Sequence, residues 1–146
     1  MRIVLYVLIL AALFFVPLQR VEIANLEPIQ AVWMYRENGN VVLETDTEDK
    51  GSGVTVADAL TDMKNNSSGI VYLDTAQYLF VSEAATEEIR VAQPYLKNSV
   101  RLCIWDGQGD FENAVKYADS HKIGLKIREW EKVGNLPELP PVKKDK

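Results

Sequence analysis

Hydrophobic positions are concentrated most densely at the start of this chain. Residues 3–16 form an unbroken apolar run directly behind Met1 and Arg2. A basic residue followed by an apolar run of this kind is typical of a secretory signal or a signal anchor. We therefore predict that residues 1–18 attach the chain to a membrane, and that the rest of the protein lies on the extracytoplasmic side.

The flanks of the run favour a segment that is retained rather than cleaved. As a helix it would span about 21 Å, which is short of a hydrocarbon core of roughly 30 Å and suits an exported segment. The small residues of a cleavage site are missing behind it, and the next small residue is Ala24. We expect an uncleaved anchor, or a secreted domain if cleavage occurs. The alternative is a buried element of a soluble domain, although residues 3–16 are long for a strand and have no polar face.

Behind this segment the pattern changes to that of a globular domain. Over residues 19–136, short alternating stretches are interspersed with stretches of helical period. They predict one α/β or α+β domain, with a mixed sheet of about five to six strands and about three helices. Residues 137–146 are rich in Pro and Lys and are predicted to form a disordered tail.

The first part of the domain carries a hairpin signal. Asn38-Gly39 separates two strand-like runs, residues 31–37 and 40–45. This pair predicts a hairpin with a type I′ turn, because both central residues of that turn have positive φ. Residues 44–53, which contain four acids and a Gly-Ser-Gly bend, are expected to form an exposed loop.

Two helices are predicted from their caps and their apolar faces. Thr55 is expected to cap one helix, since Asp58 follows three residues later, and residues 65–69 should end it. Asp110 is expected to cap the other helix. The apolar positions at helical spacing are Val56, Ala59, Leu60 and Met63 in the first helix, and Phe111, Ala114, Val115 and Ala118 in the second.

Further strands are predicted at residues 70–74, 77–82, 100–105 and 123–127. A third helix is expected to begin near Ser82 or Thr86 and to bend or end at Pro94, because proline lacks a backbone N–H.

Composition narrows the classes of function. The chain has 146 residues, a formal net charge of −5 and a pI near 4.9. This acidic balance argues against nucleic acid as the main partner. The single cysteine rules out an internal disulfide, and with it the class of small disulfide-stapled secreted domains.

Cys103 and His121 are the only cysteine and the only histidine, and a Cys–His nucleophile would need them in contact. Cys103 stands in the middle of a predicted strand, where a small buried thiol is common. His121 stands at the end of a predicted helix, where an imidazolium suits the helix dipole. We therefore predict no catalytic residue, and the alternative is a small soluble α/β enzyme with Cys103 or His121 in its site.

Two loops carry patterns that could bind ions. Gly51-Ser52-Gly53 precedes a helix and could present N–H groups to an anion, but it lacks the lysine of a P-loop and follows several acids. Calcium takes oxygen ligands, and neither candidate set matches the EF-hand pattern, so we predict no metal and no cofactor. The two candidate sets are Glu44, Asp46, Glu48 and Asp49, and the pair Asp106 and Asp110.

The order of motifs from residue 20 to residue 121 resembles the first domain of the lipoprotein (C) subunit of bacterial spore germinant receptors. The stretches that carry the resemblance are Arg20–Leu26, Gly53–Leu60, Leu73–Ala85 and Val100–Gly107 followed by Asp110. In this order, they are similar to the segment that leads into that domain, to its first helix, to its strands together with the start of its second helix, and to its later strand with the turn that follows. Two features differ: the chain lacks the family's lipidation cysteine, and family members continue into further domains.

The resemblance implies an exported module that is held at a membrane and works through protein contacts in sporulating bacteria, and it does not imply catalysis. Together with the apolar run, it predicts a non-enzymatic, membrane-tethered extracytoplasmic binding or assembly module. Its partners would be the membrane, through residues 1–18, and other envelope or spore proteins. The hairpin edge and the acidic loop 44–49 are the surfaces that we expect to face a partner.

Overall fold

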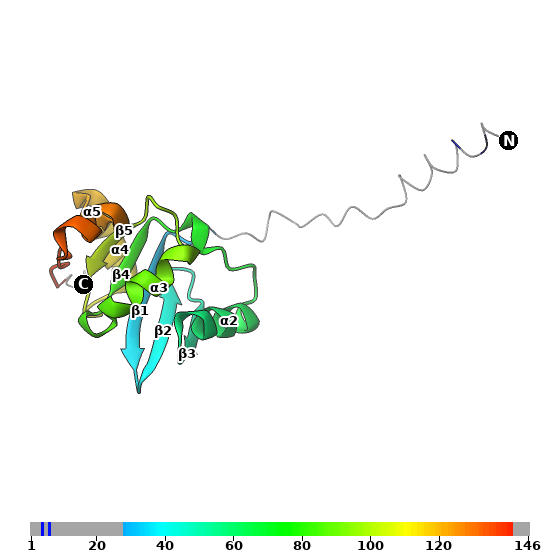
Figure 1. Cartoon of the computed structure of the whole chain (residues 1–146), viewed down its shortest axis with the longest axis horizontal. Coiled ribbons are helices and arrows are strands. Elements are labelled where there is room, and N and C mark those ends of the chain that lie inside the picture. The colour runs from blue at the N-terminus through cyan, green and yellow to red at the C-terminus, as the bar shows by residue number, and fades with distance from the viewer. Residues whose placement is uncertain (1–3, 5, 7–27, 142–146) are drawn as a thin grey trace.

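The computed structural model describes residues 28–141, together with residues 4 and 6. The predicted anchor at 1–18, apart from those two residues, and the first part of the domain at 19–27 lie outside the described residues. Within residues 28–141 the fold is α+β, with a six-stranded mixed sheet and helices on both of its faces (Figure 1). The predicted fold class is confirmed at this level.

The sheet has the strand order β3-β2-β1-β4-β5-β6. Strand β4 is parallel to β1 and to β5, and the remaining neighbours are antiparallel. The strands are β1 Ala31–Glu37, β2 Asn40–Thr45, β3 Lys50–Gly53, β4 Tyr78–Val81, β5 Arg101–Ile104 and β6 Leu125–Lys126. The helices of the described chain are α2 Val56–Asn66, α3 Ile89–Ala92, α4 Phe111–His121 and α5 Ile127–Val133, with 3₁₀ turns η2 Leu73–Thr75, η3 Glu83–Glu88 and η4 Gln93–Tyr95.

The predicted hairpin is confirmed. Strands β1 and β2 pair in antiparallel register from Val32↔Thr45 to Glu37↔Asn40. Asn38 has φ 51° and Gly39 has φ 84°, so both turn residues lie in the left-handed region that a type I′ turn requires.

The prediction of an exposed loop over 44–53 is wrong for its second half, because Lys50–Gly53 forms the edge strand β3. A Cβ on Gly51 would lie 2.2 Å from the carbonyl oxygen of Ala59 and 2.6 Å from the Cβ of Met63. The strand therefore forms where missing side chains let α2 pack directly on the backbone. The N–H of Ser52 donates to Oδ2 of Asp62 on α2, at 2.9 Å.

Helix α2 begins and packs as its sequence predicts. The Thr55 hydroxyl accepts from the N–H of Asp58, and the Asp58 carboxylate accepts from the N–H of Thr55, which completes a capping box. The four predicted apolar residues, Val56, Ala59, Leu60 and Met63, are all buried.

The middle of the chain is less regular than predicted. Residues 70–74 form no strand and lead into the 3₁₀ turn η2, while the strand predicted at 77–82 is confirmed as β4. The helix expected after Ser82 is divided into η3, the short α3 and η4. Pro94 lies in η4, directly behind α3, so the predicted interruption at this proline is confirmed.

Strand β5 and helix α4 are confirmed, and the region behind them needs two corrections. Asp110 accepts from the N–H of Glu112 and caps α4. The strand predicted at 123–127 is limited to two residues, because Ile127 begins α5 and is buried there. Of the tail predicted to be disordered from residue 137, residues 137–139 pack against β5: Glu138 forms a parallel bridge with Ile104, and Leu139 is buried.

The two faces of the sheet pack differently. An aliphatic face, with side chains such as Met34, Leu79 and Leu102, is covered by α2, α3 and α5. An aromatic face, with side chains such as Phe80 and Trp105, is covered by α4. In Figure 1, α2 and α3 lie on the near side of the sheet and α4 on the far side. No helix within residues 28–141 is both long and apolar enough to cross a bilayer.

Candidate functional site

Cys103 lies in β5 on the aromatic face and is fully buried. Burial raises the pKa of its thiol from 9.0 to about 12. Only the thiolate is a strong nucleophile, so this side chain is a poor candidate for covalent catalysis.

His121 is also a poor catalytic candidate, because it lies at the exposed C-terminal end of α4. Its ring stacks on Tyr117 with 4.1 Å between the ring centroids, and its Nδ1 lies 2.9 Å from the carbonyl oxygen of Tyr117. No hydrogen bond joins His121 to Cys103 among the residues that the structure describes.

The candidate calcium ligands are used locally as hydrogen-bond acceptors. Asp46 accepts from the backbone N–H groups of Gln30 and Ala31. Asp106 accepts from the N–H of Gln108, and Asp110 caps α4. Within the described ranges, no three His, Cys, Asp or Glu side chains are grouped closely enough to hold a metal ion.

The Gly-Ser-Gly stretch does not form an anion loop. Gly51 and Gly53 are part of β3, where α2 packs against them, and the N–H of Ser52 is bound by the Asp62 carboxylate. A carboxylate at this amide is the opposite of a phosphate-binding arrangement, so the structure contradicts this candidate.

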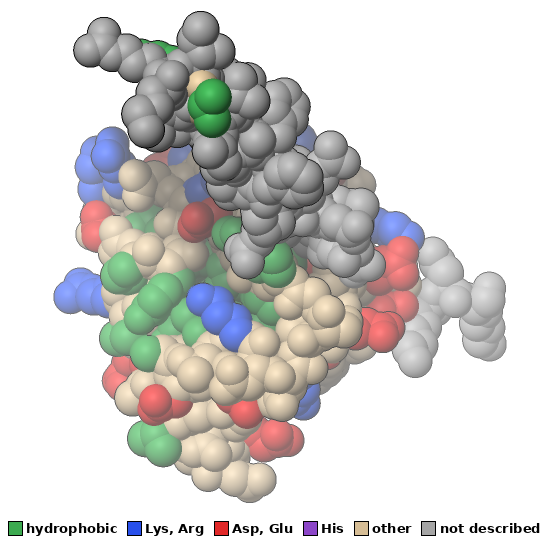
Figure 2. All heavy atoms as spheres, turned by 90° about the vertical axis from the view of Figure 1, so that its right-hand side faces the viewer, with side chains coloured by type: hydrophobic (Ala, Val, Ile, Leu, Met, Phe, Trp, Pro, Cys, Tyr) green, Lys and Arg blue, Asp and Glu red, His purple; other side chains and the backbone are tan. Residues whose placement is uncertain are grey.

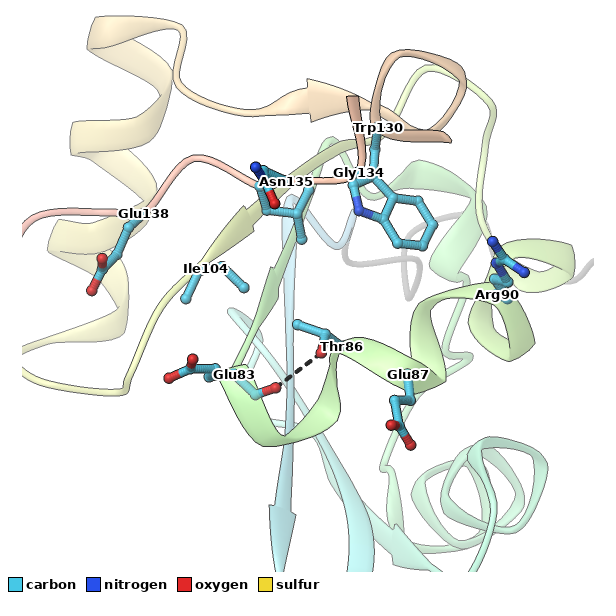
Figure 3. Close-up of a pocket in the computed structure, with 10 residues that line it drawn as sticks. Glu83, Thr86, Glu87, Arg90, Ile104, Trp130, Gly134, Asn135 and Glu138 are labelled. Carbon is cyan, nitrogen blue, oxygen red and sulfur yellow. Dashed lines mark hydrogen bonds between the residues drawn. The ribbon is translucent and has the colours of Figure 1, made fainter. Parts of the chain in front are cut away.

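Among the described residues, three hollows on the surface are considered as candidate binding sites. The first, which we name the carboxyl-end groove, has a volume of about 580 Å³ and lies where β4 and β5 end. In Figure 3, Glu83, Thr86 and Glu87 on η3 lie across from Trp130, Gly134 and Asn135, which belong to α5 and the segment behind it. Ligands of open α/β sheets bind outside the carboxyl ends of parallel strands, which makes this a natural contact surface.

The charges of the carboxyl-end groove are available for a partner. Three carboxylates, Glu83, Glu87 and Glu138, and one guanidinium, Arg90, line it. None of these four groups makes an ion pair within residues 28–141. Together with the half-buried Trp130, which also lines the groove, they form a mainly acidic surface with one aromatic ring.

The second hollow, the acidic hollow, has a volume of about 500 Å³ and lies on the aromatic face. Trp33 and Trp105 form one wall, and Gly107 has φ +79° and allows the Trp33 ring to pass where a Cβ would be 2.5 Å from it. The carboxylates that line this hollow are Glu44, Asp46, Glu48, Asp110 and Glu112. The structure thus places Asp110 in the same hollow as the acidic loop 44–49, whereas Asp106 does not line it. Among the described residues these carboxylates form no group that could hold a metal ion.

The third hollow, the amino-end groove, has a volume of about 610 Å³ and lies before the first residues of β4 and β5. Lys64 at the end of α2, residues 69–74, Pro94 and Tyr95 line it. Figure 2 views the side of the molecule where α2 lies, and hydrophobic side chains gather on this side.

Comparison with known proteins returns no match: no family model, no curated protein and no solved structure matches this chain. The resemblance to germinant-receptor C subunits therefore stays a prediction.

The sequence contains a signal for the amino-end groove in residues 70–74, which we predicted to form a strand. Val71 and Leu73 are buried, as alternation requires, whereas Ile70 is 46% exposed and Tyr72 is 48% exposed. Apolar residues at both alternating positions of a surface segment indicate a second apolar surface. The carboxyl-end groove had no such local signal, since its residues come from separate parts of the chain.

Proposed function

We propose that this chain is a membrane-tethered, extracytoplasmic binding or assembly module that acts through protein contacts. The apolar run at 3–16 behind Arg2 carries the proposal. It stands ahead of a folded domain that has its own core on both faces of a sheet. Residues 1–18 would hold that domain at the membrane surface.

The carboxyl-end groove is the contact surface that we assign to the protein partner. Its exposed carboxylates and Trp130 suit a partner surface with basic side chains, because such charges steer association and an aromatic side chain contributes binding energy. The resemblance of residues 20–121 to germinant-receptor C subunits supports a place in a spore or envelope complex.

Fractionation of cells that produce the full chain tests the tether. We expect the protein to sediment with membranes, to be extracted only by detergent, and to be digested by protease added from the extracytoplasmic side. Leu10→Arg, in the middle of the run, should release it, because an arginine at the centre of a membrane segment costs about 2.5–3.5 kcal/mol. Gln19→Arg adds the same charge outside the run and should leave it attached.

Full-length protein in the soluble fraction without detergent would overturn the proposal. A domain that resists protease on intact cells but is digested after lysis would place it on the cytoplasmic side, which also contradicts it.

A further inference from the structure

The parallel strands β1, β4 and β5 give the domain two opposite ends. The carboxyl-end groove follows β4 and β5, with Glu83 two residues behind β4 and Ile104 at the end of β5. The amino-end groove precedes the same strands, with Asp74 ahead of β4 and Tyr95 ahead of β5. Whatever contacts one groove therefore lies at the opposite end of these strands from whatever contacts the other.

The chain enters the described domain at the amino end. The backbone N–H of Ile29 donates to Oγ1 of Thr75 at 3.1 Å, and the same hydroxyl lies 2.9 Å from the carbonyl oxygen of Tyr72 in the groove wall. The segment between the predicted anchor and Pro28 is residues 19–27, which spans at most about 30 Å when fully extended. This tether keeps the amino-end groove within reach of the bilayer surface.

The apolar side chains of this groove suit a lipid interface. Ile70 is 46% exposed, Tyr72 48% and Tyr95 40%. Ile70 and Tyr72 come from the segment before β4 and Tyr95 from η4, and all three line one groove. Tyrosine is favoured at the headgroup level of membranes, because its ring is apolar and its hydroxyl is polar.

The charged residues that line the three hollows also favour the amino-end groove as the surface nearest the membrane. The amino-end groove is lined by one cation, Lys64, and one carboxylate, Asp74. The carboxyl-end groove has three carboxylates against one arginine, and the acidic hollow has five carboxylates and no cation among its lining residues. An anionic lipid surface repels the two acidic hollows and leaves the balanced one free to approach.

We propose that the amino-end groove is the surface that rests on the membrane, with Ile70, Tyr72 and Tyr95 at the headgroup level and Lys64 beside lipid phosphates. This inference rests on the proposed function, since it requires the tether. It sets the orientation of the domain: the carboxyl-end groove faces away from the bilayer, toward a protein partner.

Single-cysteine labelling tests the orientation. The native Cys103 is buried and its thiol is protonated at neutral pH, so a label reacts at an introduced surface cysteine. Full-length Tyr95→Cys and Lys116→Cys, the latter on the exposed side of α4, are labelled with an environment-sensitive fluorophore. Each is reconstituted in vesicles of equimolar phosphatidylcholine and phosphatidylglycerol, with and without a headgroup-level nitroxide lipid.

We expect the Tyr95 label to be blue-shifted and quenched by the nitroxide lipid several-fold more strongly than the Lys116 label. Tyr72→Glu in the Tyr95→Cys background should lower that quenching toward the Lys116 value, while flotation with the vesicles is unchanged. Ile70→Cys is a second label site, should Tyr95→Cys fail to fold.

Three results would overturn the orientation. Equal quenching of both labels, with the protein still floating with the vesicles, would remove the orientation and leave the tether intact. A Tyr95 label that is blue-shifted but not quenched would assign the groove to a protein contact. A chain that does not float would remove the tether and the orientation together.

Discussion

The two faces of the sheet differ in how completely helices cover them. The aliphatic face is covered across its width by α2, α3 and α5, and at β3 the helix touches bare backbone. The aromatic face is covered by α4 over β4 and β5, while Trp33 and Tyr35 on β1 stay half-exposed. The aliphatic face is thus fully covered, whereas the aromatic face is buried over β4 and β5 and partly exposed to solvent at β1.

The aromatic core is held by rings that contact one another. Phe80, Trp105 and Phe111 have centroid separations of 5.5–5.8 Å. Trp105 also contacts Trp33, at 4.7 Å. Because Trp33 stacks on Tyr35 at 4.1 Å, the buried rings continue into the half-exposed ones. Substitutions along this series test whether the face changes from core to surface.

The largest effect is expected at Trp105, which is 2% exposed. Trp105→Ala should lower the free energy of unfolding by about 3–5 kcal/mol, because it leaves a cavity among the rings. Trp130→Ala, at the half-buried margin of the aliphatic face, is the matched control and should cost less. Urea denaturation followed by circular dichroism measures both, and equal losses would contradict the ranking.

Alkaline pH should weaken the aromatic face through Cys103. The folded thiol has a pKa of about 12 against 9.0 in the unfolded chain, so its contribution is complete below pH 9 and is lost as the pH rises toward 12. The loss approaches about 4 kcal/mol at the upper limit. Burial and the nearby Asp119 also raise the pKa of Tyr78, which acts in the same direction.

Cys103→Ala isolates the thiol from the tyrosines and lysines that titrate in the same range. Stability curves of the wild type and the variant, measured from pH 8 to the alkaline limit of folding, should converge as the pH rises. Curves that stay parallel would show that the thiol does not titrate with folding.

Gly51→Ala tests the close backbone contact of the aliphatic face. A methyl group there would lie 2.2 Å from a carbonyl oxygen and 2.4 Å from a backbone nitrogen of α2, so the helix must move. We expect a loss of about 3 kcal/mol, the upper range for overpacking. Gly39→Ala is the control, since nothing lies within 4 Å and only its positive φ opposes the change, at about 1–2 kcal/mol.

The smallest effect is expected on the open part of the aromatic face. Tyr35→Ala removes a half-exposed ring and its stacking on Trp33, and should cost about 1 kcal/mol. Tyr35→Phe keeps the ring and loses the hydroxyl's surface contacts, to Glu44 at 3.5 Å and to Lys50, so its stability should stay close to that of the wild type. A loss at Tyr35→Ala as large as at Trp105→Ala would mean that this region is closed core.

What the sequence predicted well was local. The Asn38-Gly39 turn, the Thr55–Asp58 capping box and the Asp110 cap each depend on residues within a few positions of one another, and all three are confirmed. Alternation located β5, and the apolar run within 77–82 located β4, whose four residues are all buried and so lie on both faces of the sheet.

The features that the sequence did not predict depend on contacts between residues far apart in the chain. Strand β3 has no strand-forming side chain at Gly51 or Gly53, and it exists because α2 covers those glycines. Leu139 is buried in the core of the aromatic face, and its N–H donates to the carbonyl oxygen of Ile104; the Pro-rich sequence of the tail does not reveal either contact. The grooves share this origin, since each joins segments that are far apart in the chain.

The hydrogen bond from Ser52 to Asp62 has a consequence for how this protein behaves among its own copies. An unpaired edge strand offers its N–H groups to any other strand, which is a common route to aggregation. Here β3 is four residues long, and the amide of Ser52 is already occupied by a charged side chain that would also repel an incoming carbonyl. Many copies crowded on one surface could therefore lie side by side without their sheets pairing edge to edge through β3.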